Sequence, residues 1–184
     1  PSGCGKTTLL NLIGGLDRPD AGRVVVGGLD LGALNDRELS RFRNRSVGFI
    51  FQTYCLHPRL SARENVMLPG LVGELPTEEC RRRAEAALRQ VGLEDFMDKP
   101  PRMLSGGQMQ RVAIARALAL DPGILLADEP TGNLDQNTAQ EALEFIARLN
   151  RERGLSVLLV THEERAARYA SKAMRMDNGR LSLL

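Results

Sequence analysis

Two glycine-containing segments of the sequence have residue types that suit the binding of a phosphate group. Residues 2–8 read SGCGKTT and residues 104–108 read LSGGQ, and each directly precedes a stretch with helical periodicity. The N–H groups at a helix start can bind an anion, and glycine has no Cβ to block the approach. The first segment matches the phosphate loop G-x-x-x-x-G-K-[ST] from the second residue of that motif on, since the first glycine would precede Pro1. The sequence therefore predicts two phosphate-binding segments in separate parts of one chain.

The first segment offers both phosphate ligands and a metal ligand. Lys6 is predicted to bind the β- and γ-phosphates of a nucleotide, and the hydroxyl of Thr7 to bind Mg²⁺. Backbone N–H groups from Gly3 to Thr8 would surround the β-phosphate. Cys4 is interpreted as a bystander in this loop, although a thiol at a helix start can also serve as a redox sensor. The candidate nucleotide ligands here are Ser2, Gly3, Cys4, Gly5, Lys6, Thr7 and Thr8.

Polar side chains follow three apolar runs that are typical of buried strands. Asp128 and Glu129 follow ILLA. His162 follows VLLVT, and Gln52 follows VGFIF. If these strands are parallel, the side chains meet at the edge of the sheet where ligands bind in open α/β folds. Asp128 would then help to hold Mg²⁺, and Glu129 would orient or deprotonate an attacking water molecule.

His162 and Gln52 are ambiguous when each is taken alone, because a histidine or glutamine after a strand is often structural. Their positions favour a role for His162 in contacting the γ-phosphate or positioning water, and for the Gln52 amide in reaching metal and water. The alternative for Asp128 and Glu129 is a pair of surface acids, which the nearby phosphate loop makes the weaker interpretation. His57 lies in a proline-rich segment with no partner and is expected at the surface.

The overall composition is that of an ordinary globular protein and restricts the classes of partner. The 25 Lys and Arg residues nearly balance the 23 Asp and Glu residues, so the net charge of +2 does not favour a nucleic-acid or anionic-lipid partner. The longest apolar runs, such as ILLA and VLLV, are far too short to cross a bilayer. Three scattered cysteines fit free thiols in a reducing cytosol.

Strand and helix patterns alternate after residue 102, which predicts a parallel sheet covered on both faces. The segment 53–102 is rich in proline and shows one clear helix, 78–91, with Thr77 as its N-cap and Gly92 as its C-terminal stop. The arginines at 81–83 are expected to pair with Glu78 and Glu79 on a solvated face rather than to form a binding patch. The other predicted elements are helices at 6–13, 36–43, 138–151 and 164–170, strands at 22–28, 47–51, 124–127 and 157–161, and a hairpin whose turn is 177–179.

Taken together, these residues resemble the nucleotide-binding subunit of an ABC transporter. The matching motifs are PSGCGKTT as the Walker A loop, FQ as the Q-loop, LSGGQ as the signature, ILLADE as the Walker B strand, GNLD as the D-loop and VTHE with the switch histidine. The resemblance covers all 184 residues. DEPTGNLD, GGLDRPDAG, IFQTYCLHPRL and ARENVMLPG are similar to the branch that includes lipoprotein-releasing, macrolide-exporting and cell-division ATPases.

The resemblance implies an α/β fold of the P-loop NTPase (RecA-like) type. Its parallel sheet core would comprise residues 1–52 and 103–184, with an inserted helical subdomain at 53–102. The resemblance also implies that the first strands and the adenine-stacking aromatic residue are missing, because they would lie upstream of Pro1 in an N-terminally truncated fragment. We accordingly expect an exposed sheet edge and weak or no ATP binding by the chain as given.

The resemblance also offers a reason for two phosphate-binding segments. In this family two subunits face head to tail, and the signature of each closes on the nucleotide held by the other. Ser105, Gly106, Gly107 and Gln108 would therefore serve a partner's ATP, and Asp135 of GNLD would cross the same interface. The implied cofactors are ATP and Mg²⁺. The implied partners are a second cassette, in a homodimer or pseudo-dimer, and a membrane permease met by the stretch after Gln52; the implied location is cytoplasmic, on the inner face of the cell membrane.

Three functional hypotheses follow from these motifs. The favoured one is an ATP-hydrolysing subunit that powers export or extrusion through a permease. The second is an ATPase of the same fold that transmits force without moving a substrate, as in the cell-division relatives. The third is a soluble ABC ATPase acting on nucleic acid, which would need a coiled-coil insertion, a second cassette or a basic stripe, and the sequence shows none of these.

Overall fold

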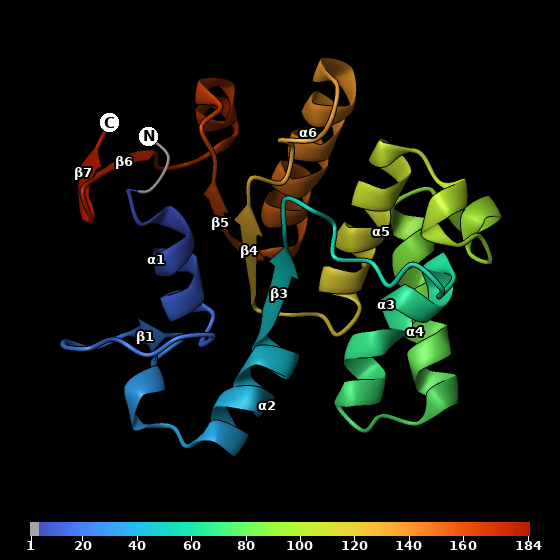
Figure 1. The fold of residues 1–184 in the computed structure, drawn as a ribbon, viewed down its shortest axis with the longest axis horizontal. Helices are drawn as coiled ribbons and strands as arrows, with labels where there is room; N and C mark the ends of the chain where they lie inside the picture. The colour runs from blue at the N-terminus through green and yellow to red at the C-terminus, as the bar shows by residue number, and fades with distance from the viewer. Residues whose placement is uncertain (1–3) are drawn as a thin grey trace.

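The computed structural model describes residues 4–184, so Ser2 and Gly3 of the candidate phosphate loop lie outside the described residues. A parallel sheet lies at the centre, with the strand order β3 (Val47–Ile50), β4 (Ile124–Asp128) and β5 (Ser156–Val160) (Figure 1). In its register, Ile50 pairs with Ala127, and Asp128 pairs with Val160. The predicted parallel sheet is confirmed, and the three strands end at the same edge.

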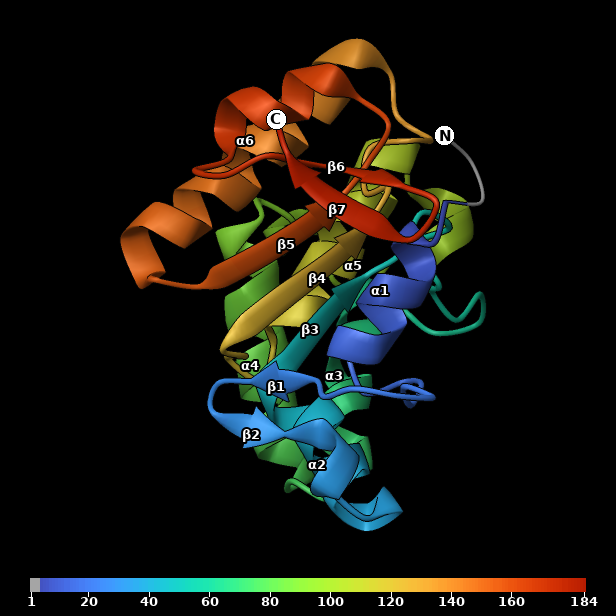
Figure 2. The ribbon, with the colours of Figure 1, turned by 90° about the vertical axis from the view of Figure 1, so that its left-hand side faces the viewer.

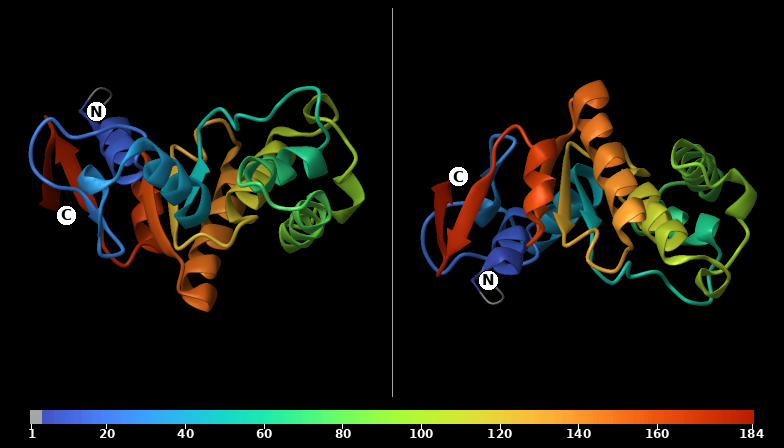
Figure 3. Two further views of the ribbon diagram at one scale, coloured as in Figure 1. Left: turned by 90° about the horizontal axis from the view of Figure 1, so that it is seen from below. Right: turned by 90° about the horizontal axis from the view of Figure 1, so that it is seen from above.

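Helices cover both faces of this sheet, as Figure 1 and the two views of Figure 3 show. On one side lie α1 (Lys6–Ile13) and α2 (Asp36–Ser46), and on the other lie α5 (Gly106–Leu118) and α6 (Gln136–Arg153). The predicted helices at 6–13, 36–43 and 138–151 are thus confirmed, with small differences at their ends.

Residues of β4 alternate between the two faces, as the pleat of a strand requires. Leu126 packs in a cluster with Leu10 of α1 and Phe42 of α2. Its neighbour Leu125 packs in a second cluster with Val112 of α5. Both leucines are at most 1% exposed, so the sheet is buried on both sides.

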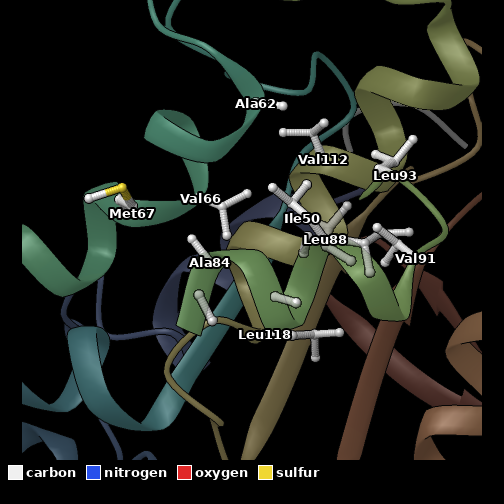
Figure 4. Packing of buried hydrophobic residues seen from close by; sticks show 14 of the residues in the cluster. Ile50, Ala62, Val66, Met67, Ala84, Leu88, Val91, Leu93, Val112 and Leu118 are labelled. Carbon is white, nitrogen blue, oxygen red and sulfur yellow. The ribbon is translucent and has the colours of Figure 1, made fainter. Parts of the chain in front are cut away.

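A further layer of helices packs against α5 on the side away from the sheet. It consists of α3 (Ala62–Val72) and α4 (Thr77–Gln90), followed by two short 3₁₀ helices, Glu94–Phe96 and Pro101–Met103. Figure 4 shows Val66 of α3, Leu88 of α4 and Val112 of α5 meeting Ile50 of β3 in one cluster. Each of these four side chains is at most 1% exposed. The helical layer is therefore fixed to the sheet through α5.

The segment 53–102 contains two α-helices rather than the single predicted one. Pro69 lies inside α3 and interrupts the helical pattern of the sequence, because proline cannot donate a backbone hydrogen bond. The start of α3 is nevertheless well defined by a capping box. The amide of Glu64 donates to Ser61 Oγ at 3.2 Å, and the amide of Ser61 donates to Glu64 Oε2 at 2.7 Å.

Three predictions about other segments need correction. Thr77 is the first residue of α4 rather than its N-cap, which is Pro76, whereas Gly92 follows the helix with the predicted left-handed φ of 68°. The segment 164–170 forms the 3₁₀ helix η4 (Glu164–Tyr169) instead of an α-helix, a common form for a short piece. The strand at 22–28 is only β1 (Val25–Val26), which pairs with β2 (Leu29–Asp30).

The charged face of α4 agrees with the prediction of a solvated surface. Glu79 accepts hydrogen bonds from Arg82 at 2.7 Å and from Arg83 at 2.6 Å. The bond from Arg82, followed by that from Arg83, lowers the pKa of Glu79 to about 2. These arginines are therefore satisfied within their own helix.

The predicted C-terminal hairpin is confirmed as β6 (Met174–Asp177) and β7 (Arg180–Leu183). Asn178 and Gly179 have φ values of 44° and 75°, the left-handed pair of a type I′ turn. Figure 2 shows the hairpin crossing in front of the start of α1. The amide of Gly179 donates to the carbonyl of Cys4 at 3.0 Å, so the hairpin turn contacts the phosphate loop.

Two expectations from composition can be compared with the described residues. Across residues 4–184, no helix has both the length and the apolar character needed to cross a membrane. Cys4, Cys55 and Cys80 are free thiols, as predicted.

Gly48 of β3 is expected not to tolerate a side chain. A Cβ there would lie 2.5 Å from the carbonyl oxygen of Ala117 in α5, so the helix or the strand would have to move. Gly48→Ala should lower the free energy of unfolding by about 1–3 kcal/mol, measured by urea unfolding followed by circular dichroism. Gly123→Ala is the matched control, because a Cβ at Gly123 meets no described atom within 4 Å. Equal stability of the two variants would contradict this packing.

Candidate active site

The phosphate loop runs directly into α1. Gly5 precedes the helix with a left-handed φ of 103°, a conformation that favours glycine. The amide of Leu9 donates to the carbonyl of Gly5 at 2.9 Å, so the amides of Thr7 and Thr8 lie in the first turn, where a helix supplies no acceptor of its own. Lys6 Nζ lies 3.5 Å from Cys4 Sγ, and the lysine side chain therefore lies along the loop. These features fit an anion site at a helix start.

Two of the three side chains predicted to reach Mg²⁺, those of Thr7 and Asp128, are in contact. Thr7 Oγ1 donates a hydrogen bond to Asp128 Oδ2 at 2.9 Å, which joins the start of α1 to the end of β4. A hydroxyl and a carboxylate are the oxygen ligands that P-loop proteins supply to Mg²⁺, and the ion keeps its other positions for phosphate and water. Within the described part of the chain, no three His, Cys, Asp or Glu side chains gather as a metal cluster. The donor set therefore fits Mg²⁺ bound together with a phosphate.

Glu129 and His162 are brought together at the ends of β4 and β5. His162 Nδ1 lies 2.9 Å from Glu129 Oε2, and Thr161 Oγ1 donates to the same oxygen at 3.1 Å. The Glu129 side chain is 15% exposed and that of His162 is 70% exposed. Since the ring contacts Glu129 through Nδ1, Nε2 is its second hydrogen-bonding atom. The carboxylate is thus held in place, while the histidine faces outward.

The backbone of Glu129 has an unusual conformation for a residue with a side chain. Its φ is 46°, in the left-handed region that favours glycine. The amide of Glu129 donates to the Val160 carbonyl at 2.8 Å, and its own carbonyl accepts from the amide of Gly132 at 3.1 Å. Such strain persists only where the surroundings fix it, and it is often found at functional sites.

Gln52 follows β3 and reaches the turn that comes after Glu129. A Cβ built on Gly132 would lie 3.1 Å from Gln52 Nε2, and the carbonyl of Gln52 accepts a hydrogen bond from Asn133 Nδ2 at 2.7 Å. Among the residues that the structure describes, Gln52 is not bonded to Thr7 or Asp128. It therefore lies beside the Glu129 turn rather than on the metal pair.

The signature segment forms the start of α5. Ser105 is the N-cap, and its Oγ accepts from the amide of Gln108 at 3.2 Å, while Gln108 Oε1 accepts from the amide of Ser105 at 2.9 Å. Gly106 and Gly107 are the first helical residues, and a Cβ on Gly107 would lie 2.6 Å from Thr138 Cγ2. The second predicted phosphate-binding segment is therefore a capped helix start, and α6 packs too closely for a side chain at Gly107.

The comparisons with known proteins agree with this geometry. The ABC transporter family model matches residues 1–132. This chain belongs to the ABC transporter family. It is 46% identical to the lipoprotein-releasing system ATP-binding protein LolD 1 of Rhodopseudomonas palustris, over 99% of this chain and 81% of that protein. It is 47% identical to the macrolide export ATP-binding/permease protein MacB of Syntrophobacter fumaroxidans, over 97% of this chain and 25% of that protein.

A solved structure shows the same architecture. The dimeric post-hydrolysis state of the ATP-binding cassette MJ0796, bound to ADP and Pi, superposes with a TM-score of 0.88 at 43% identity. The match covers 100% of this chain and 82% of that one. The chain is therefore an ATP-binding and ATP-hydrolysing subunit of an ABC transporter with the fold of an ABC cassette, as the motifs predicted.

Asp135, in the D-loop of this ABC ATPase, caps its own helix. Its Oδ1 accepts from the amides of Asn137 and Thr138 at 3.1 Å each, and its Oδ2 accepts from Thr138 Oγ1 at 2.6 Å. The hydroxyl of Thr138, followed by its amide, lowers the pKa of Asp135. The D-loop aspartate is thus fixed as a carboxylate at the start of α6.

Sequence reasoning missed the bond that joins the turn before the D-loop to the loop of the switch histidine. Thr131 is 2% exposed, and its Oγ1 donates to Glu163 Oε1 at 2.9 Å. The amide of Glu163 in turn donates to Thr161 Oγ1 at 3.0 Å, and that hydroxyl contacts Glu129. Both residues lie in motifs recognised in the sequence, DEPTGNLD and VTHE, but no local spacing indicates that their side chains meet. Glu163 therefore links the turn before the D-loop to Glu129, the residue proposed as the base.

Removing the Glu163 carboxylate should affect both stability and turnover. Glu163→Ala leaves the buried Thr131 hydroxyl without its acceptor, which should cost about 1–3 kcal/mol in unfolding free energy. Turnover should fall about tenfold or more, because the loop that carries Thr161 and His162 loses its side-chain bond to Thr131. Urea unfolding and steady-state ATP hydrolysis of the full-length protein measure the two effects. Glu164→Ala, at the next, exposed position, is the control. Equal turnover of the two variants would contradict a role for Glu163 in positioning the site.

Proposed function

We propose that this ABC ATPase powers export through a membrane permease and works as a head-to-tail dimer. The observation that carries the proposal is the placement of its two phosphate-binding segments. Because α1 and α5 lie on opposite sides of the sheet, the phosphate loop and the signature of one chain do not face the same nucleotide (Figure 1). A second chain facing the first brings its signature to that nucleotide. The dimeric state of the related cassette supports this pairing.

The nucleotide and metal ligands come from one chain. Amides of the loop from Gly3 to Thr8 surround the β-phosphate, and Lys6 neutralises the charge of the β- and γ-phosphates. Thr7 and Asp128 hold Mg²⁺, as their contact at 2.9 Å suggests. When bound, MgATP supplies the phosphoryl group that is transferred to water.

Glu129, His162 and Gln52 are proposed to act on the attacking water and the γ-phosphate. The Glu129 carboxylate accepts a proton from the water. His162 is oriented by its Nδ1 contact with Glu129, and as an imidazolium it would also donate from Nε2 to a γ-phosphate oxygen. The Gln52 amide reaches metal and water from the turn beside Gly132 and must move toward the Thr7–Asp128 pair to do so.

The signature binds the nucleotide of the other chain through Ser105, Gly106, Gly107 and Gln108. Because Ser105 Oγ accepts a hydrogen bond from the Gln108 amide, its own O–H proton is directed elsewhere and can be donated to a phosphate oxygen. The backbone N–H groups of Gly106 and Gly107 lie at the positive end of the α5 dipole, which favours an anionic phosphate. Asp135 lies at the start of α6, next to this proposed interface. Its side chain would cross the interface and help to set the geometry of each nucleotide site.

The membrane partner is proposed from the relatives and from the arrangement of the chain. LolD 1 and MacB are named for lipoprotein release and macrolide export, which favours an exporter. Residues 1–52 and 103–184 would form the ATP-binding core, and 53–102 the helical subdomain whose first stretch meets the permease. The proposed location is therefore the cytoplasmic face of the membrane. The nearly balanced charge gives no reason to add a nucleic-acid partner.

The dimer is tested by blocking hydrolysis in the full-length protein. Glu129→Gln should lower kcat by about 10²–10⁴-fold and should form a stable dimer with ATP and Mg²⁺, since both phosphate-binding segments remain. Adding Ser105→Arg to this variant should abolish the dimer, because the large cation blocks the signature. Sedimentation velocity with and without ATP measures both effects.

Ser40→Arg is the control for the added arginine. Ser40 is exposed on α2, which lies near the opposite end of the strands from the site (Figure 1), so this change should leave the ATP-dependent dimer intact. A Glu129→Gln protein that stays monomeric with ATP and Mg²⁺ would refute the head-to-tail dimer. So would an Ser105→Arg variant that dimerises normally.

A further inference from the structure

A groove lies between the end of α4, α5 and α6, away from the candidate active site. Its volume is about 680 Å³, and small-molecule sites in proteins span about 300–1,000 Å³. Its walls include Val91 after α4, Ile114 of α5 and Phe145 of α6. Figure 3 shows α6 lying beside α5. Among the described residues, none that lines the groove belongs to the phosphate loop or to the ends of β4 and β5.

Gln110 of α5 lines this groove with an amide that no described residue satisfies. It is 1% exposed, and neither its Nε2 nor its Oε1 has a hydrogen-bond partner in the described part of the chain. A buried polar group without a partner destabilises a fold, so it requires an explanation. Because Nε2 donates and Oε1 accepts, a ligand satisfies both atoms only if it offers an acceptor beside a donor. The edge of a nucleobase, such as N7 and the N6 amino group of adenine, offers this pair.

The groove also has an excess of positive charge on α6. Arg148 and Arg151 line it, are exposed and form no ion pair among the residues that the structure describes. Arg111 differs, since its Nη2 lies 2.7 Å from Glu141 Oε2. The guanidinium of Arg148 lies over the ring of Phe145, with Cζ 5.1 Å from the ring centroid, which holds it at the groove wall. Two guanidinium groups without a carboxylate partner favour a phosphate.

The groove is closed on the side of the signature. Gly107 and Thr138 border it there, and a Cβ on Gly107 would lie 2.6 Å from Thr138 Cγ2. This close packing of α5 against α6 separates the groove from Ser105 at the helix start. A ligand in the groove would therefore be distinct from a nucleotide bound at the signature.

We propose that this groove binds a nucleoside monophosphate as a second nucleotide site. The edge of the base pairs with the Gln110 amide, and the base packs against the apolar side chains of Val91 and Ile114. Arg148 and Arg151 donate hydrogen bonds to the phosphate, whose charge of about −2 they match. The inference does not rest on the proposed dimer, because every group that it uses comes from one chain.

AMP is the probe, and its binding to the full-length protein is measured by isothermal titration calorimetry without ATP or Mg²⁺. The double variant Arg148→Ala, Arg151→Ala should bind AMP at least tenfold more weakly than the wild type. Arg153→Ala is the control, since Arg153 is exposed on the same helix and does not line the groove; its affinity should stay within twofold. Inorganic phosphate should bind at least tenfold more weakly than AMP, because it lacks the base.

Gln110→Met distinguishes a ligand-binding amide from a structural one. Methionine has a similar length and shape without an amide to satisfy. This variant should lose at least tenfold in affinity for AMP, while its melting temperature stays equal or rises. Unchanged affinity would overturn the inference, and so would a loss of affinity that accompanies a fall in melting temperature.

Lys6→Ala distinguishes the groove from the phosphate loop, where AMP could also bind. This change should leave the affinity for AMP at the groove within threefold of the wild type. The inference is wrong if AMP does not bind, if inorganic phosphate binds as tightly, or if Lys6→Ala abolishes binding that the double arginine variant retains. None of these results depends on whether Glu129→Gln forms a dimer with ATP, so the proposed function is tested separately.

Discussion

The parallel pairing of β4 with β3 and β5 is the constraint on which the site depends. Side chains alternate along a strand, so a slip of one residue in β4 would exchange the residues that face α1 with those that face α5. Leu125 and Leu126 lie in separate buried clusters and oppose that slip. The same register sets Asp128 beside Thr7 and sets the Glu129 side chain beside Thr161 and His162. Packing of the core therefore sets the positions of these polar side chains, and the hydrogen bonds between them only adjust their orientations.

The sequence revealed those parts of the fold whose signals are local. The apolar run of β4, the hairpin turn at Asn178 and the carboxylates after a strand depend on neighbouring residues, and each was predicted correctly. The helix α3 was missed because Pro69 interrupts its pattern, although Ser61 already carried a capping signal. The bond between Thr131 and Glu163 could not be predicted, since it joins residues far apart in the chain through a geometry that only the packed sheet creates.

Two residues predicted as ligands or interface groups also serve as helix caps. Ser105 caps α5 and Asp135 caps α6, and each satisfies amides that a helix start leaves without acceptors. Capping fixes the rotamer of the side chain before any ligand arrives, which lowers the entropy lost on binding. For Ser105 it also selects the direction of the O–H proton. The structural role and the proposed binding role therefore do not compete at these positions, because the cap would prepare the side chain for its ligand.

In the proposed dimer, the nucleotide contributes contacts to both chains, so the stability of the interface depends on nucleotide by mass action. Glu129, the proposed base, need not be ordered by closure, because it is already held through its amide, its carbonyl and its carboxylate. Closure must instead bring the partner's Ser105 to a phosphate oxygen. Hydrolysis then separates the γ-phosphate from the rest of the nucleotide. The phosphate oxygen that accepts the Ser105 hydrogen bond is then no longer attached to the nucleotide in the phosphate loop of the facing chain. The reaction proposed for Glu129 thus removes the contact that joins the two chains, which allows the dimer to open after each turnover.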